Sequence, residues 1–311
     1  MPTKTKRTVA DVVTDSIIAA LDEGTVPWDR PWKAMPGFGA PGNVVSKRPY
    51  RGVNVLLTAF QPFAEPWWIT RKQAHAKDLR IADNQFKEST PIVLWKPTER
   101  RCPQDTPGAV FVNGEWVKRS MILRFYSVWN VEQIEGYRDD PTLGGLVPPP
   151  PEPPSMSERE VEARCMFEDY LHREGIALGY GGDSASYMPT TDAVRLPSIE
   201  SFKTVPGFLH TAFHEAGHST GHEKRLARPS VMSPAFGSEP YAQEELVAEL
   251  TAAMCCSSCG IDPDVQRSAA YIENWLQVLR DDRGLIITAA QAAQKAHDLI
   301  LDPTTDEEDP S

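Results

Sequence analysis

Long apolar segments are absent from this chain of 311 residues. No window of about 18 uncharged apolar residues exists, so we expect no membrane-spanning helix and no membrane partner. The N-terminal residues include Lys4, Lys6 and Arg7 and lead into an amphipathic pattern, not into the apolar core of a signal peptide. These absences favour a cytoplasmic protein.

Cysteine is also scarce, and an odd total of 5 cannot pair completely. Cys255, Cys256 and Cys259 fall in one expected helix, and cysteine is among the most commonly buried residue types. A single C-x-x-C spacing without a second pair is weak evidence for metal or redox chemistry. We interpret these residues as buried thiols of a protein in a reducing compartment.

The net charge of −11 is unevenly distributed along the chain. Residues 1–138 have a net positive charge, whereas the remaining residues are strongly acidic. A basic half joined to an acidic half suggests two different partners, and an anionic polymer suits only the first half.

A chain of this length usually forms more than one domain. The proline-rich segment PPPPEPP favours an extended spacer. We therefore predict a first domain over residues 1–147, a linker over 148–154, a second domain over 155–301 and a disordered acidic tail over 302–311. A proline-rich loop inside a single domain is the alternative interpretation of the linker.

Local patterns predict an α+β protein. Thr8 and Asp11 have the spacing of a helix-capping box, and Asn113-Gly114 between two apolar segments predicts a type I′ hairpin turn. The first half should be a small mixed antiparallel sheet, with helices over 8–23 and from Thr70, and strands over 91–95, 109–112, 115–117 and 122–129.

The second half is predicted to be mainly helical. Ser157 and Glu160 have the capping-box spacing at the start of a helix that ends before Gly175. Two short strands and a buried helix should follow, over 185–188, 193–196 and about 202–220, and then three helices over about 240–258, 263–281 and 286–301.

Residues 214–218, His-Glu-Ala-Gly-His, are the most informative segment. Histidines four residues apart project from the same helix face, so His214 and His218 can bind one metal ion. Zinc is the usual occupant of such a site, and another divalent ion such as Mn²⁺ is an alternative. Glu215 would then lie beside a water on the metal and act as general base. Apolar residues with helical spacing surround the motif, which argues against two solvated histidines.

A third metal ligand must come from elsewhere in the chain. The metzincin pattern requires a histidine six residues after His218, but Lys224 occupies that position and His222 lies two residues early. That class of metallopeptidase is therefore excluded.

The expected helix around residues 241–250 offers three glutamates instead. We predict Glu245 as the third ligand and Glu249, one turn later, as the acceptor of a hydrogen bond from a ligand histidine. Glu244 should face solvent. The candidates for stabilising a tetrahedral oxyanion are Tyr187, His222 and Tyr241.

Aromatic and cationic side chains alternate through residues 26–72. Unpaired bases stack on aromatic rings at about 1–3 kcal/mol each, while Lys and Arg bind the phosphates between them. The candidate contacts to single-stranded DNA are Trp32, Lys47, Arg48, Tyr50, Arg51, Asn54, Trp68, Arg71 and Lys72. The alternative is that the tryptophans form the core of a small domain and the cations are solvated.

Several stretches resemble one protein family. In the first half, VPWDRPW at 26–32, SKRPYRGVN at 46–54, WITRKQA at 68–74 and YSVWNVEQI at 126–134 are similar to the N-terminal domain of ArdC-type antirestriction proteins. In the second half, YGGD at 180–183, STGHEKRL at 219–226, EELVAE at 244–249 and AAQAAQKA at 289–296 are similar to the metallopeptidase domain of the same proteins.

This resemblance implies an N-terminal domain that binds single-stranded DNA and a C-terminal zincin-like metallopeptidase domain. It also implies a protein of a plasmid, phage or related mobile element, acting in a bacterial host cell to protect incoming DNA from restriction. The chain departs from the family at FKEST, residues 86–90, where a Gly-Glu turn is usual. If that turn contacts DNA in the family, this protein binds DNA differently.

Three functional hypotheses follow. The leading one is an antirestriction protein that binds single-stranded DNA and cleaves a DNA-associated protein with a zinc peptidase site, because tethering to DNA raises the local concentration of such a substrate. The alternative is a protein that shields single-stranded DNA without proteolysis and carries a structural metal. A peptidase effector acting on a neighbouring cell is disfavoured by the missing signal peptide and by the basic first half.

Overall fold

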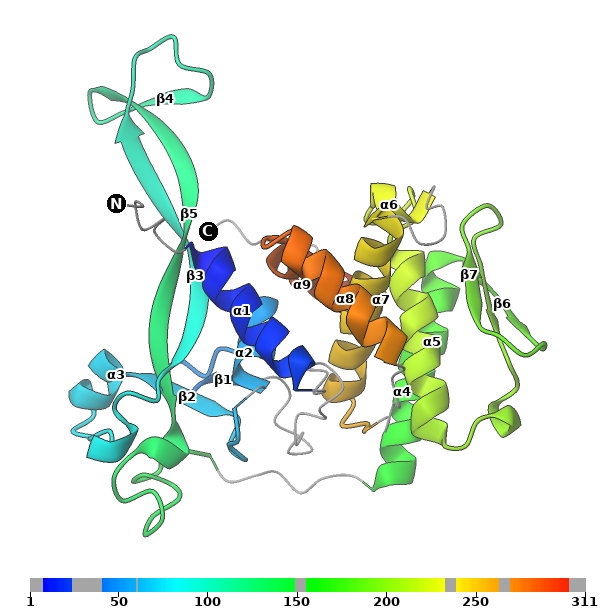
Figure 1. The fold of residues 1–311 in the computed structure, drawn as a ribbon, viewed down its shortest axis with the longest axis horizontal. Coiled ribbons are helices and arrows are strands. Elements are labelled where there is room, and N and C mark those ends of the chain that lie inside the picture. The colour runs from blue at the N-terminus through cyan, green and yellow to red at the C-terminus, as the bar shows by residue number, and fades with distance from the viewer. Residues whose placement is uncertain are drawn as a thin grey trace.

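The computed structural model describes residues 8–23, 41–59, 61–148, 155–232, 239–262 and 269–301. Figure 1 shows a sheet-containing half, a central group of helices, and a small second sheet at the far end. The predicted α+β fold class is confirmed. None of the described helices is both long enough and apolar enough to cross a membrane.

The larger sheet has the strand order β1-β2-β5-β3, and β4 pairs with β5. Its strands are β1 (Gly42–Asn43), β2 (Trp67–Thr70), β3 (Thr90–Arg101), β4 (Ala109–Val112) and β5 (Glu115–Asn130). Strands β3 and β5 are antiparallel and much longer than predicted, and they pair without a break from Thr90↔Val128 to Arg101↔Val117. Pro97 is tolerated within β3 because β3 lies at the edge of the sheet.

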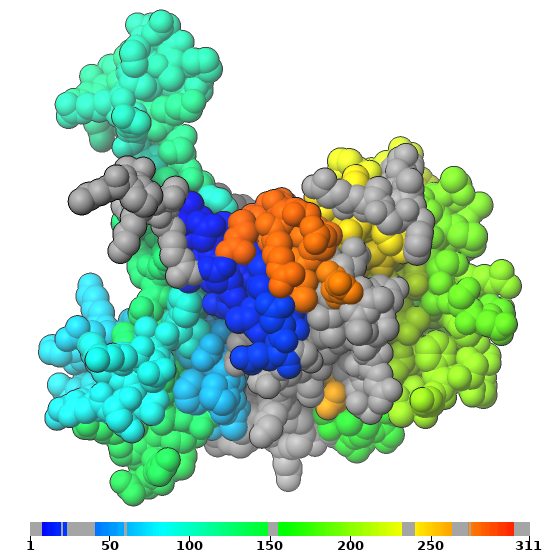
Figure 2. Space-filling model, viewed as in Figure 1, coloured from blue at the N-terminus to red at the C-terminus, as the bar shows by residue number. Residues whose placement is uncertain are grey.

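The outer part of β3 and β5, together with β4, forms an arm that extends away from the body (Figure 1). The hairpin at its tip has Asn113 at φ 48° and Gly114 at φ 86°. Positive φ at both positions is what a type I′ turn requires, so the predicted hairpin is confirmed. Figure 2 shows that the end of the arm stands clear of the remaining described surface.

Three helices belong to the first half: α1 (Val9–Asp22), α2 (Val53–Ala59) and α3 (Arg71–Ala76). The predicted capping box at the start of α1 is confirmed, because the Asp11 amide donates to Thr8 Oγ1 at 3.2 Å and the Thr8 amide donates to the Asp11 carboxylate at 2.7 Å. The predicted start of α3 after Thr70 is confirmed as well.

In the second half, helix α4 (Met156–Glu174) ends at Gly175, which has φ 68°. Its capping box is formed by Ser155 and Glu158, so the prediction of Ser157 and Glu160 was wrong by two residues. Both pairs have the spacing that a capping box requires. The earlier pair directly follows the proline segment, and nothing in the sequence prevents the helix from starting there.

The remaining elements surround the helix that carries the histidine motif. A three-stranded sheet of order β6-β8-β7 includes a strand that was not predicted, β6. The elements are β6 (Ala177–Tyr180), β7 (Ser186–Met188), β8 (Ala193–Leu196), α5 (Val205–Thr220), α6 (Pro229–Met232), α7 (Glu239–Ser258), α8 (Ala269–Asp281) and α9 (Leu285–Leu301).

The largest hydrophobic core contains residues from both halves of the chain. Ile17 and Leu21 of α1 pack in one cluster with Leu250 of α7, Trp275 of α8 and Ile286 of α9. Figure 1 shows α1 lying against α8. The apolar stripe of the first helix is therefore buried largely by the helices of the second half, and Val93 of β3 and Leu123 of β5 belong to the same cluster.

Candidate metal centre

Helix α5 carries the two histidines, and its local sequence explains why it is helical. Thr204 caps its N-terminus by accepting a hydrogen bond from the Gly207 amide at 3.2 Å, and a proline stands in its first turn. Phe208 and Phe213 are buried in a core cluster with residues of α4 and β8. This burial fixes the rotation of α5, so the face carrying the histidines is directed toward α7.

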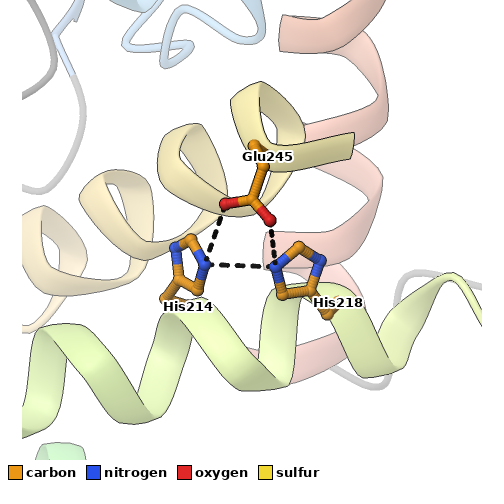
Figure 3. A group of neighbouring side chains, drawn as sticks. All are labelled: His214, His218 and Glu245. Carbon is orange, nitrogen blue, oxygen red and sulfur yellow. Dashed lines mark hydrogen bonds and ion pairs between the residues drawn. The ribbon is translucent and has the colours of Figure 1, made fainter. Parts of the chain in front are cut away.

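His214, His218 and Glu245 converge on one point (Figure 3). The two Nε2 atoms lie 3.1 Å apart. Glu245 places Oε2 3.6 Å from Nε2 of His214 and Oε1 3.5 Å from Nε2 of His218. Ligand atoms at about 2.0–2.2 Å from a tetrahedral metal lie roughly 3.3–3.5 Å from one another, so these donors fit one divalent cation.

Gly217 allows α7 to approach α5 closely enough for this geometry. A Cβ atom at this position would lie 3.2 Å from Ala248 Cα and 3.2 Å from Thr251 Cβ on α7. Any larger residue would push the two helices apart. The glycine between the histidines thus helps to bring Glu245 within reach of them.

Two further carboxylates lie behind the histidines. Glu249 Oε1 is 3.3 Å from Nδ1 of His214, and Glu244 Oε1 is 3.4 Å from Nδ1 of His218. A carboxylate at Nδ1 favours the tautomer with its proton on that nitrogen, which directs the Nε2 lone pair toward the metal position. The structure thus places Glu249 beside His214. The sequence pattern predicts Glu249 as the acceptor of a hydrogen bond from a ligand histidine.

Glu244 was expected to face solvent, and that prediction was wrong. Its side chain is 3% exposed. Arg228 donates from Nε to Oε2 at 3.0 Å and from Nη2 to Oε1 at 2.6 Å, and Ser230 donates to Oε2 at 2.6 Å. Burial raises the pKa of Glu244, but the hydrogen bonds from His218 and Arg228 outweigh it and lower the pKa to about 2. Glu244 therefore remains a carboxylate.

Arg228 was missed by sequence reasoning. It follows α5 in a loop and also donates to the Gly217 carbonyl at 2.8 Å and to Thr220 Oγ1 at 2.7 Å. It therefore joins the C-terminal end of α5 to Glu244 of α7. A single arginine in a loop has no periodic pattern that would reveal such a role.

Glu215 is 7% exposed and interacts with both histidines and with the backbone of Tyr187 in β7. Burial raises the pKa of Glu215, while the charges of His214 and His218 and a hydrogen bond from the Tyr187 backbone lower it. Burial lowers the pKa of His214, but Glu249, Glu215 and Glu245 raise it to about 9. The surrounding carboxylates thus favour a positive charge at this centre.

The three oxyanion candidates lie in different surroundings. The Tyr187 hydroxyl donates to Asp192 at 2.8 Å and accepts from Arg225 at 3.2 Å, so it is already engaged in the structure. His222 is 5% exposed, and its Nδ1 accepts from the Lys224 amide at 3.2 Å. Tyr241 stands on α7 one turn before Glu245 and is partly exposed.

The candidate DNA contacts divide into interior and surface residues. Trp68 is 2% exposed and packs edge-on against Phe63, and Tyr50 is 8% exposed. The Asn54 amide donates to the Val93 carbonyl at 2.8 Å and accepts from the Val93 amide at 2.7 Å, which satisfies an edge of β3. In this structure these three side chains offer no face to a base. For Trp68, the alternative of a tryptophan in the domain core describes what is observed.

The cationic candidates are closer to the surface. Lys47 donates to the Leu146 carbonyl at 2.6 Å, Arg51 pairs with Asp298 of α9, and Arg71 lies over the ring of Phe86 at 4.9 Å. Arg48 and Lys72 are exposed, and Trp32 lies outside the described residues.

The helix-borne histidine pair, the glutamate from a following helix and the adjoining small sheet define a zincin-like metallopeptidase domain. Comparison with known families agrees: residues 166–292 match the family of zincin-like metallopeptidases, and residues 7–129 match the N-terminal domain of anti-restriction factor ArdC.

Solved structures of an ArdC protein are similar over almost the whole chain. The metal-free crystal structure of the antirestriction ArdC protein from the R388 plasmid has 31% sequence identity and a TM-score of 0.71, covering 94% of this chain and 97% of that chain. The Mn(II)-bound structure of the same protein has 28% identity and a TM-score of 0.70, covering 97% and 100%. This chain belongs to the ArdC antirestriction family.

Two other relatives are similar over nearly the whole of this chain. DNA primase TraC of Escherichia coli is 34% identical over 306 residues, which are 95% of this chain but 27% of TraC. This chain thus spans about a quarter of that relative. The uncharacterized protein y4eC of Sinorhizobium fredii (strain NBRC 101917 / NGR234) is 33% identical over 304 residues, which cover 95% of this chain and 93% of y4eC.

Proposed function

We propose that this protein of a mobile element protects incoming DNA from host restriction by binding single-stranded DNA and cleaving a DNA-associated protein. The observation that carries the peptidase half is the convergence of His214, His218 and Glu245 with Glu215 beside them. Membership of the ArdC family supports the antirestriction half.

The residues of the centre have separate roles in this proposal. His214, His218 and Glu245 would hold a divalent cation, with zinc as the proposed ion. When bound, the cation supplies Lewis acidity and lowers the pKa of water. Glu215 would accept the proton of the attacking water, and its burial raises its pKa toward the range that a general base needs.

A peptide substrate would be held beside β7. Within the described residues β7 is the end strand of its sheet, paired with β8 on one side. An extended peptide that adds to such an edge by backbone hydrogen bonds would pass next to Glu215, since the Tyr187 backbone already contacts that carboxylate.

The test is the Glu215→Gln variant of the full chain. Gln keeps the size of the side chain but removes the base, so bound zinc (measured by mass spectrometry) and affinity for single-stranded DNA should match the wild type. Cleavage of a protein substrate should be abolished. A His214→Ala variant, which should lose the metal, is the companion measurement.

Protection from restriction is then measured for both variants in cells that receive unmodified DNA. Loss of protection with Glu215→Gln supports a proteolytic mechanism. Full protection by Glu215→Gln contradicts it and favours the alternative, a DNA-shielding protein whose metal is structural.

A further inference from the structure

The arm formed by β3 and β5 has two faces of very different charge. Side chains alternate between the faces of a strand, and residues paired across two strands share a face. The register pairs Leu94 with Arg124, Lys96 with Ile122, Thr98 with Ser120 and Arg100 with Lys118. We call the face that carries these residues the basic face.

The cations of the basic face are Lys96, Arg100, Lys118 and Arg124, and all are exposed. None of them forms an ion pair with another residue in the described part of the chain. No acidic residue of either strand lies on this face. Their charge is therefore left available to an anionic partner.

The opposite face contains both acidic residues of the two strands. Glu99 accepts from Arg119 at 2.9 Å, and Glu115 lies 2.6 Å from Arg101. The charges of this face are thus compensated within the arm. The contrast arises from strand periodicity, because residues adjacent in sequence lie on opposite faces, as Arg100 and Arg101 do in β3 and Lys118 and Arg119 in β5.

Exposed aromatic rings lie at both ends of the basic face. Tyr126 is 38% exposed at the base of the arm, opposite Ile92 in the register. At the tip, Phe111 of β4 is 61% exposed and lies 5.2 Å from the ring of its cross-strand partner Trp116. Tyr126 lies ten positions after Trp116 in β5, which corresponds to about 33 Å along a strand.

We propose that the basic face of the arm binds single-stranded DNA, with bases stacked on Tyr126 and on Phe111 and Trp116 and with phosphates bound by the cations between them. This inference rests on the proposed function and assigns its DNA-binding part to a surface. A row of cations on a face without acidic residues of either strand suits the phosphates of a polyanion. The exposed rings at both ends of the face suit unpaired bases. Figure 2 shows that the tip of the arm is accessible to such a strand.

The arm contains a matched pair of variants. Arg100→Gln with Lys118→Gln removes two cations of the basic face. Arg101→Gln with Arg119→Gln removes two cations from the same two strands, each one residue away but on the opposite face. Both variants change the net charge equally, and all four positions are exposed.

Binding of the full-length protein to a fluorescent oligothymidine of about 20 nucleotides is followed by anisotropy over a range of salt concentrations. The basic-face variant should bind about tenfold or more weakly, and the slope of log K against log salt should fall by about 1.4, because each phosphate contact contributes about 0.7 on single strands. The opposite-face variant should bind within about twofold of the wild type.

A second measurement uses the aromatic residues. Phe111→Ala with Tyr126→Ala should weaken binding about fivefold or more while leaving the salt slope unchanged, since stacking involves no counterion release. The melting temperature of each variant establishes that the fold is retained.

Equal effects of the two charge variants, or no effect of either on a wild type that binds, overturn the assignment to this face. Equal affinity of the wild type for duplex and single strand overturns the stacking contacts. A wild type that does not bind single-stranded DNA at all contradicts the proposed function itself, and the surface assignment with it.

Discussion

Arg228 binds the carboxylate of Glu244 through two donors, Nε at 3.0 Å and Nη2 at 2.6 Å. The same carboxylate lies 3.4 Å from Nδ1 of His218. A loop arginine is thus linked to His218, one of the candidate metal ligands, through an intervening glutamate. Glu249, which lies on the same helix as Glu244 and Glu245, is placed in a similar way 3.3 Å from Nδ1 of His214.

Glu244→Gln tests this relationship. The amide keeps the size of the side chain but removes its negative charge. The change therefore weakens the pairing with Arg228 and the interaction with Nδ1 of His218. We expect the affinity for zinc to fall about 10- to 100-fold, as measured by competition with a chromophoric chelator. Glu223→Gln, a change of an exposed glutamate in the loop after α5, is the control and should leave the affinity unchanged. An unaltered affinity of Glu244→Gln means that Glu244 does not position His218.

Gly217→Ala tests the close approach of α5 and α7. The added methyl group meets Ala248 and Thr251 at 3.2 Å, so the helices must move apart. Overpacking of this kind costs about 1–3 kcal/mol, and displacement of Glu245 should weaken metal binding as well. Chemical denaturation and metal titration measure the two effects. Gly179→Ala is the control, since nothing lies within 4 Å of a Cβ atom at that position. Unchanged stability and metal affinity would show that the contact relaxes without consequence.

Ile17→Ala tests whether the two halves unfold as one unit. Ile17 is 0% exposed and packs with helices of the second half. Removing it should cost about 2–5 kcal/mol, and the unfolding transitions seen by probes in the two halves should shift together. Ser16→Ala changes an exposed neighbour on α1 and should have little effect. If only one of two separate transitions shifts, the shared core does not couple the halves.

Metal loading should stabilise the protein. A ligand that binds only the folded state adds about 2.7 kcal/mol at a free concentration 100 times its dissociation constant. We expect the melting temperature to rise on addition of Zn²⁺ or Mn²⁺ and to return when a chelator is added. The His214→Ala variant lacks one of the three donors and should show a much smaller rise. An equal rise in both proteins would place the stabilising ion elsewhere.

Much of this protein could be predicted from local patterns. The capping box of α1, the Asn113-Gly114 turn and the shared face of the two histidines on α5 all depend on residues within a few positions of one another. Glu245 was predicted from another helix because its spacing to Glu249 indicated a shared face, and Figure 3 shows it beside both histidines.

The cationic face of the hairpin arm has a pattern in the local sequence, but composition alone does not reveal it. The cations at Lys96 and Arg100 recur with the period of a strand, but the strand was predicted to end at Trp95. The aromatic and basic residues around Trp68 were weighted more heavily, and Trp68 is buried in the structure. Alternation within a long hairpin, and not the density of aromatic and basic residues, separates an exposed face from a core.

The sequence by itself determined which residues could bind a metal, because helical spacing places His214 and His218 on one face whatever surrounds them. Only the tertiary structure decided that Glu244 is buried beside Arg228 and that α1 packs on the helices of the second half. These outcomes depend on contacts between segments far apart in the chain. Such contacts depend on which apolar surfaces pack against one another. The local sequence does not predict that packing.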